Sequence, residues 1–310
     1  MKKNFLLRWI MRNRTQYLTN FMQAFNYPEE ARVALLKTYK VILNNEKANF
    51  SFEQSILLYE SGSCLEYSLM MKHTARAAEI SGEPKETVDL LMVLCLSEHM
   101  KELYRQRGLD MQIYHDSCLD FKSKLIECQQ FKGLWGTFVT DWFGRFFNLT
   151  RFALGRLQFE IIPVPAERTV GEYSIKVNDP TVNIHIPGIG PMKYEDCRQS
   201  FIQASKFFAP AFPDGVVSFR CGSWLLAPEH EEMLSPESNI RKFMSFFNIA
   251  TFGRTVEHDF WRIFGRDDIE NISEWPVDNS LRRAYMKAIK EEKIPHIGVG
   301  VFFMKDGQFL

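Results

Sequence analysis

The spacing of apolar residues along the chain changes near residue 150. Over the first 130 residues, apolar positions recur at intervals of three and four, which is the spacing of one buried helix face. This spacing predicts helices over residues 29–45, 64–80, 84–108 and 110–130, joined by short connections. Helices of these lengths with short connections favour an antiparallel all-α array.

Two polar residues are positioned to cap these predicted helices. Ser51, followed by Gln54, has the spacing of a capping box. Asp110 stands directly before the last helix of the array, where its side chain can accept from the exposed N–H groups of the first turn. We therefore expect one helix to begin at each of these positions.

Beyond residue 150, apolar and polar residues alternate in short runs. The pattern predicts strands over residues 151–162, 172–178, 182–186, 216–226, 259–264 and 298–304, and helices over residues 194–208, 238–248 and 280–292. Strands interleaved with helices indicate a mixed sheet flanked by helices. The predicted fold class is therefore α+β, with an all-α region followed by this mixed β-sheet.

Proline and glycine are concentrated in the second half of the chain. Of the 13 prolines only Pro28 and Pro84 precede residue 163, and of the 17 glycines only three precede residue 133. Both residue types weaken helix interiors and suit turns. We therefore expect two domains, residues 1–134 and 135–310. The aromatic-rich segment 131–150 is interpreted as a packed connection, with an aromatic ligand-binding wall as the alternative.

Charge and cysteine content narrow the class of protein. The chain has 38 basic and 38 acidic residues, and this neutrality argues against bulk nucleic-acid binding. No run reaches the roughly 18 apolar residues of a membrane span. The six cysteines form no CxxC pair, so we expect reduced, buried thiols in a cytoplasmic protein without a metal site.

The segment 182–208 carries the most specific chemistry. A predicted strand leads into Pro187-Gly188-Ile189-Gly190-Pro191, and a predicted helix follows at once. Glycines allow backbone N–H groups to approach a ligand, and a helix N-terminus adds unpaired donors. These groups could hold a pyrophosphate without a basic field, although a purely structural turn explains the pattern as well. The full dinucleotide-binding fingerprint and the P-loop are both absent.

Four ordered motifs in the second half carry a resemblance to a known family. They are GRLQFE (155–160), NIHIPGIGPM (183–192), CGSWLL (221–226) and LSPESNIRKF (234–243). The sequence resembles a bacterial, largely uncharacterised family that joins an N-terminal helical region to a GNAT-like acyltransferase domain. The resemblance implies an acyl-CoA-dependent N-acyltransferase that transfers an acyl group, with acetyl expected, to a primary amine by direct attack on the thioester.

The same resemblance implies where acyl-CoA, the co-substrate, would bind. The pyrophosphate would lie on the loop and the helix from Tyr194, and the pantetheine between strands 182–186 and 216–226. The implied contact residues are Ile184, Ile186, Gly188, Ile189, Gly190, Met192, Lys193, Ser223 and Trp224. Here Pro187-Gly188-Ile189-Gly190-Pro191 replaces the usual Q/R-x-x-G-x-G/A loop of the fold, and Pro191 has no N–H to donate.

Two residues are candidates for the general base that such a reaction needs. Glu160 lies in an apolar strand, and His185 titrates near neutrality on the strand before the loop. A structural carboxylate and a core histidine are the alternatives. The general acid is unassigned, with Tyr194 and Tyr285 as distant candidates. Cys221 would be a nucleophile only if it met His185.

Two other functions stay open at this stage. One is a non-catalytic CoA- or ligand-binding module that keeps a GNAT-like shape, since the loop is altered and the general acid is missing. The other is a protein-interaction scaffold that uses the Met-rich helices of residues 64–111. The expected partners are acyl-CoA and an unidentified amine, without nucleic acid or membrane, and a homodimer is one arrangement left open.

Overall fold

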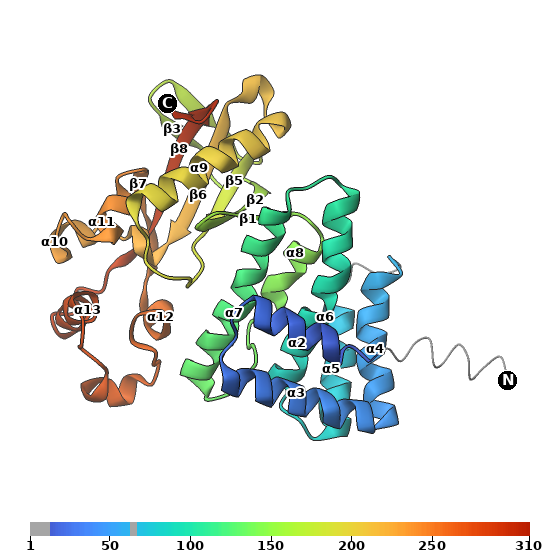
Figure 1. Cartoon of the computed structure of the whole chain (residues 1–310). Helices are drawn as coiled ribbons and strands as arrows, with labels where there is room; N and C mark the ends of the chain where they lie inside the picture. Colours follow the sequence, from blue (N-terminus) through green and yellow to red (C-terminus); the bar gives the residue numbers. More distant parts are fainter. Residues whose placement is uncertain (1–12, 63–66) are drawn as a thin grey trace. The chain divides into compact units, whose positions relative to one another are not determined.

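The computed structural model describes residues 13–62 and 67–310. Contacts within the chain divide it into two compact units, Met1–Phe152 and Ala153–Leu310, which are described separately (Figure 1). The segment 135–152 therefore folds with the helical unit, and the division comes later than the boundary expected from the sequence.

The first unit is built from helices. They are α2 (Thr15–Ala24), α3 (Glu29–Asn44), α4 (Glu46–Glu60), α5 (Tyr67–Ser81), α6 (Lys85–Gln106), α7 (Met111–Lys132), the 3-10 helix η1 (Thr140–Phe143) and α8 (Gly144–Phe147). Helix α6 is the centre of this unit, since every residue from 87 to 97 is buried. A helix that is buried on all sides needs neighbours on all sides, and α2, α3, α4, α5 and α7 contact it.

The capping predictions have different outcomes. Asp110 caps α7 as predicted, and its side chain accepts from the N–H of Gln112 at 2.8 Å. The capping box at Ser51 is wrong, because Ser51 lies inside α4 and donates to the carbonyl of His73. Asn45 caps this helix instead. Cys64, where another helix was expected to begin, lies outside the described residues.

The aromatic segment after α7 packs into the helical unit. Phe143 and Phe147 are buried. The ring of Phe143 lies edge-on to Phe121, with the ring centres 5.2 Å apart, and that of Phe147 lies edge-on to Tyr59. These contacts support the interpretation as a packed connection, because the rings are used by the core.

The second unit contains the sheet, whose first strand begins two residues before the division between the units. Its strands are β1 (Arg151–Leu154), β2 (Leu157–Pro163), β3 (Arg168–Val170), β4 (Tyr173–Ile175), β5 (Pro180–His185), β6 (Val217–Ser223), β7 (Asn248–Thr255), β8 (His296–Lys305) and β9 (Gln308–Phe309). The main sheet has the order β1-β2-β5-β6-β8-β7, with β9 beside β8, and β3 and β4 form a separate ribbon. Strands β5 and β6 are parallel, whereas β2–β5, β6–β8 and β7–β8 are antiparallel.

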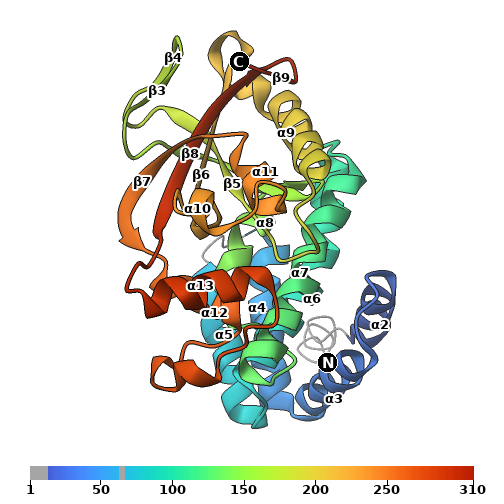
Figure 2. The same cartoon turned by 90° about the vertical axis from the view of Figure 1, so that its left-hand side faces the viewer.

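Different elements cover the two faces of the sheet (Figure 2). Helix α9 (Tyr194–Phe208) packs on one face, where the ring of Phe201 contacts Phe159, Phe219 and Phe302. The β3–β4 ribbon packs on the other face, against Val301 and its neighbours. Side chains alternate along a strand, so residues next to Phe159 and Phe219 point to the ribbon side.

The remaining helices of the second unit are short, except for one. They are η2 (Ala209–Ala211), η3 (Pro213–Gly215), η4 (Trp224–Leu226), α10 (His230–Met233), α11 (Asn239–Met244), η5 (Glu257–Asp259), α12 (Phe260–Phe264), η6 (Ile269–Glu274) and α13 (Ser280–Lys290). Helices α12 and α13 lie between β7 and β8 in the chain and enclose an apolar cluster that includes Phe264, Trp275 and Tyr285.

Four strand predictions need correction. The strand predicted over 216–226 is the shorter β6, and its last three residues form η4. The strand predicted over 151–162 is two strands, β1 and β2, because Gly155 and Arg156 form a turn. The strand predicted over 259–264 is helix α12, whose buried Phe260, Ile263 and Phe264 have helical spacing. The strand predicted over 172–178 is shorter, and it pairs with β3 outside the main sheet. Strand β7 was not predicted. The fold class itself is confirmed.

Candidate active site

Glu160 and His185 meet on the ribbon side of the sheet. The antiparallel register of β2 and β5 sets Glu160 opposite Asn183, two residues before His185, so all three side chains share a face. His185 Nε2 lies 2.6 Å from Glu160 Oε1. Glu160 is 3% exposed, and His185 is half-buried. A buried carboxylate in hydrogen-bond contact with one imidazole nitrogen orients the ring and fixes its tautomer.

Asn183 on β5 and Arg220 on β6 extend this pair. Asn183 Nδ2 lies 3.1 Å from His185 Nε2, and Arg220 Nη1 donates to Asn183 Oδ1 at 3.3 Å. The amide oxygen accepts from Arg220, so the amide nitrogen faces the imidazole, and when Nε2–H donates to Glu160 this amide is a neighbour of Nε2 and not a second hydrogen-bond partner. A polar chain therefore crosses from β2 through β5 to β6. Gln158, opposite His185 in the register, is also buried, and its Oε1 has no partner among the described residues.

The parallel strands beside this chain pair over a short stretch only. The β5–β6 ladder joins Val182 to Phe219 and Asn183 to Arg220, and then stops. Strand β6 nevertheless stays paired with β8 as far as Ser223. The sheet therefore opens between β5 and β6 at the level of His185, and this opening is called the β5–β6 gap.

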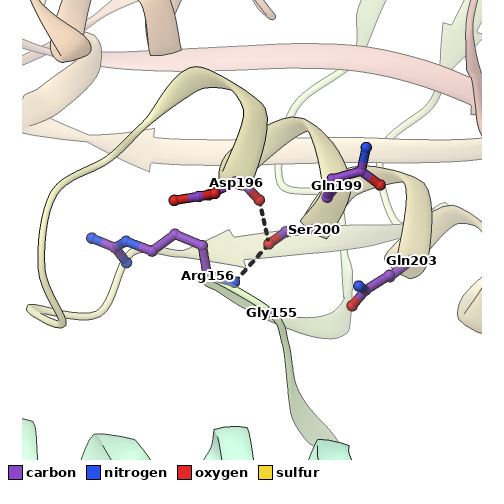
Figure 3. A pocket seen from close by; sticks show the side chains of 6 residues that line it. All are labelled: Gly155, Arg156, Asp196, Gln199, Ser200 and Gln203. Atoms are coloured by element: carbon purple, nitrogen blue, oxygen red, sulfur yellow. Dashed lines mark hydrogen bonds between the residues drawn. The ribbon is translucent and has the colours of Figure 1, made fainter.

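The loop after β5 is held by an arginine from the β1–β2 turn. Arg156 donates to the carbonyls of Pro187 at 2.9 Å, Gly190 at 3.0 Å and Pro191 at 3.2 Å. Its backbone N–H donates to Ser200 Oγ on α9 at 2.8 Å, so its side chain extends away from the helix toward the loop (Figure 3). A surface pocket of about 340 Å³ adjoins it, lined by Gly155, Arg156, Asp196, Gln199, Ser200 and Gln203.

This arginine decides which way the loop N–H groups point. In a trans peptide the carbonyl of one residue and the N–H of the next point in opposite directions. Because Arg156 binds the carbonyls of Pro187 and Pro191, the N–H groups of Gly188 and Met192 face away from it. Within the described part of the chain, no protein acceptor bonds the N–H groups of residues 188–190 or 192. Gly190 has a φ of 68°, which suits glycine.

Helix α9 begins directly after this loop without a side-chain cap. Lys193 occupies its N-cap position and is exposed. The N–H groups of the first turn therefore add to the donors of the loop. Glu195 in that turn is already bonded to Arg198 at 3.3 Å and to Gln199. The loop and helix end together form a set of outward backbone donors that suits an anion.

Comparison with known protein families matches both units. The model of an N-acyltransferase N-terminal domain matches residues 16–149, and that of a GNAT-like C-terminal domain matches residues 151–302. The chain belongs to the GNAT-like acyltransferase family with an N-terminal helical domain. A comparison with curated protein sequences finds no match.

Solved structures share the fold of this GNAT-like acyltransferase. An acyltransferase in complex with decanoyl-CoA and teicoplanin has a TM-score of 0.69 and 16% identity, over 96% of this chain and 93% of that one. A tryptophan-to-alanine variant of an acyltransferase in complex with octanoyl-CoA has a TM-score of 0.68 and 16% identity, over 92% and 87%. A complex with CoA and 10C-teicoplanin has a TM-score of 0.67 and 16% identity, over 91% and 86%.

Several residues expected to contact CoA in this GNAT-like acyltransferase have structural contacts of their own. Ile184 is buried, and it lies on the face that α9 covers. Met192 is buried, whereas Ile186 and Ile189 are half-buried. Ser223 caps η4 by accepting from the N–H of Leu225.

Trp224 and the two tyrosines considered as acids are engaged elsewhere. The indole of Trp224 lies edge-on to Tyr285, which contacts His230 Nε2 through its hydroxyl at 2.7 Å. Burial raises the pKa of Tyr285 well above its usual value, so its hydroxyl releases a proton poorly. Tyr194 stacks on Phe246 at the start of α9. The general acid stays unassigned.

Cys221 of this acyltransferase does not meet His185. It follows Arg220 in β6, so its side chain points to the opposite face of the sheet. Burial raises the pKa of the Cys221 thiol to about 12. It is therefore a core thiol near neutral pH. Cys95, Cys118, Cys128 and Cys197 are also buried free thiols.

The described residues contain neither a cluster of metal ligands nor a membrane-spanning helix. Across residues 13–62 and 67–310, no group of three or more His, Cys, Asp or Glu side chains could hold a metal ion. Among the helices in the same ranges, none is both long and apolar enough to cross a membrane.

Sequence reasoning missed three residues of this candidate site. They are Arg156, Asn183 and Arg220. Arg156 contacts Pro187, 31 positions away, and Arg220 contacts Asn183, 37 positions away. The only signal was Arg220, the one charged residue of a largely buried strand, because a charge in such a strand requires a partner.

Proposed function

We propose that this chain is an acyl-CoA-dependent N-acyltransferase that acylates a primary amine by direct attack on the thioester. The observation that carries the proposal is the contact between Glu160 and His185 beside the β5–β6 gap. A carboxylate-oriented imidazole is a suitable general base, and the gap offers a path for the thioester to reach it.

The loop and helix end support binding of the CoA diphosphate. Outward N–H groups at Gly188 and Met192, with the uncapped start of α9, suit phosphate oxygens. The pantetheine would then follow the β5–β6 gap toward His185. The solved acyltransferases of this fold contain CoA, octanoyl-CoA or decanoyl-CoA, which further supports acyl-CoA as the donor.

The proposed reaction uses one proton transfer from the amine. His185 accepts a proton from the attacking amine while Glu160 holds Nε2–H, which assigns the base role to Nδ1. The amine nitrogen bonds to the thioester carbon, and the C–S bond then breaks. CoA leaves as a thiolate. One proton then protonates it, which matches the proton that the amine lost, so charge and atoms balance.

A binding and turnover experiment tests the proposal. Calorimetry with CoA, acetyl-CoA, octanoyl-CoA and decanoyl-CoA should detect binding, and the series reports whether acetyl, the expected group, is preferred. Release of free thiol in the presence of a panel of primary amines should then follow. Absence of binding at millimolar ligand would overturn the proposal, and binding without any turnover would identify a non-catalytic module instead.

Two substitutions test the role of the pair. Glu160→Gln and His185→Gln should each lower kcat by roughly 10²- to 10⁴-fold. They should leave the Kd for acyl-CoA within about twofold, since neither side chain is assigned to the diphosphate loop. His258→Gln is the matched control, because His258 is exposed on η5 of the same unit. If all three variants kept the activity of the parent protein, Glu160 and His185 would have no role in the reaction.

A further inference from the structure

Two arginines on the ribbon side of the sheet have neutral partners only. Arg220 on β6 donates to Asn183 Oδ1, and Arg168 on β3 donates to the carbonyl of Val299 at 3.3 Å. Neither forms an ion pair with any residue that the structure describes. Four other arginines of the unit, Arg198, Arg262, Arg266 and Arg282, each contact a carboxylate, whereas Arg156, Arg241 and Arg283 also donate only to backbone carbonyls.

The two guanidinium groups converge over one pair of residues in the sheet. A Cβ atom at Gly222 would lie 3.6 Å from Arg220 Nη2 and 3.8 Å from Val299 Cγ2. Gly222 and Val299 are direct partners in the β6–β8 ladder, and the Val299 carbonyl is the group that Arg168 binds. Both guanidinium groups therefore lie beside the Gly222–Val299 pair. Gly222 adds no side chain to the space that they face.

Holding two cations together without an anion is unfavourable. Burial lowers the pKa of Arg220, and the positive charge of Arg168 lowers it further, against the opposing effect of Cys221. A guanidinium presents a planar fork of donors that matches a carboxylate, and two of them suit one anion better than neutral oxygens do. Such an arrangement would suit an anion supplied by a separate molecule.

The location of these cations narrows the choice of anion. In the parallel register Asn183 stands beside Arg220, so His185 is level with Gly222, across the β5–β6 gap. The proposed function puts the CoA phosphates on the loop, whereas the pantetheine and the thioester carry no charge. An anion opposite His185 would therefore have to come from the acceptor.

We propose that the acceptor amine carries a carboxylate, which Arg168 and Arg220 bind while the amine faces His185. This inference rests on the proposed function, and it names the class of acceptor as amino acids and related amino-carboxylates. Amines without a carboxylate would leave the two arginines uncompensated and would bind more weakly.

Binding is tested first, because it does not depend on turnover. Ligand-observed NMR would compare L-phenylalanine with 2-phenylethylamine, L-leucine with 3-methylbutylamine and L-lysine with cadaverine, with CoA present and absent. We expect at least one amino acid to bind roughly tenfold or more tightly than its decarboxylated partner. Arg220→Met and Arg168→Met should each abolish that difference, and Arg220→Lys should retain part of it.

Kinetics give the second readout. In Arg220→Met and Arg168→Met, the KM for the carboxylate acceptor should rise by about 10- to 100-fold, while the KM for acyl-CoA changes little. Arg283→Met is the control, since Arg283 is exposed on α13 of the same unit. Thermal unfolding of each variant checks that the fold is retained.

The outcomes separate this inference from the proposed function. If acyl-CoA binds and is used, but both members of every acceptor pair bind equally or not at all, the carboxylate assignment is wrong and the proposed function stands. If O-phosphoethanolamine bound more tightly than the amino acids, the acceptor's anion would be a phosphate, and the carboxylate assignment would again be wrong. If acyl-CoA does not bind, the proposed function fails, and the NMR comparison still decides the anion site.

Discussion

At the scale of single residues, the site depends on side chains that act on the backbone or on one another. Arg156 binds three carbonyls of the loop after β5. Burial lowers its pKa, yet the bonds to the loop compensate its desolvation in part. Its position in the turn between β1 and β2 does not predict this contact, because the contact depends on how β2 and β5 align.

The candidate base shows the same limit. Glu160 and His185 could each be selected from the sequence, since an acid in an apolar strand and a histidine before a glycine loop are both unusual. Their contact could not be predicted, because it follows from the antiparallel register of β2 and β5. Asn183 and Arg168 carried no signal at all, since polar residues are common near strand ends.

A substitution of Arg156 tests whether it shapes the loop. Arg156→Met should raise the Kd for CoA by roughly tenfold, because the loop carbonyls lose a charged donor and the N–H groups lose their fixed direction. The Kd for an octanoyl-pantetheine thioester, which lacks the diphosphate, should change by less than about twofold. Calorimetry measures both values. An equal loss for both ligands would indicate a general disturbance of the unit.

At the scale of elements, regular periodicity was the most reliable guide. Helix α9 has the predicted bounds, Tyr194–Phe208, because its buried residues keep helical spacing over four turns and a loop with two prolines precedes it. The stretch that forms α12 is too short for its spacing to be recognised. Strand β7 was missed because its pairing with β8 comes from a distant part of the chain.

One close approach between elements leads to a stability prediction. Strand β8 passes η4 so closely that a Cβ atom at Gly298 would lie 1.8 Å from the carbonyl oxygen of Leu226. Gly298→Ala should therefore lower the free energy of unfolding by about 3 kcal/mol or more, or prevent folding. Gly253→Ala on β7 is the matched control, since nothing lies within 4 Å of its added Cβ. Urea unfolding compares the two, and equal stabilities would contradict the close packing.

At the scale of the whole molecule, the change of periodicity near residue 150 identified the fold class correctly. An array of helices is followed by a mixed sheet, and both units have cores of their own. Family and activity class came from short motifs rather than from periodicity. The chain is electrically neutral overall, so local arrangement, and not a general field, has to supply its attraction for anions.

Acid stability is a whole-molecule property that one buried histidine should influence. Burial lowers the pKa of His230 from 6.5 to about 4 in the folded state. The unfolded chain therefore binds more protons between these pH values, so the free energy of unfolding falls as the pH drops from 6.5 to 4. The full loss is on the order of 3 kcal/mol.

His230→Gln should remove this part of the pH dependence. Glutamine does not titrate, and it can still hydrogen-bond to the hydroxyl of Tyr285. The variant is expected to lose less stability than the parent chain between pH 6.5 and 4, as measured by urea unfolding at several pH values. Identical slopes for both proteins would show that His230 titrates normally.

The short β5–β6 ladder has a consequence for how a ligand would be recognised. Where the ladder stops, the sheet has two edges in its interior, whose peptide groups face each other without pairing. An elongated ligand with amide groups can hydrogen-bond to such edges as an added strand would. The pantetheine arm contains amides of this kind. Binding would then complete a sheet, and amide hydrogen exchange in β5 and β6 should slow together when it occurs.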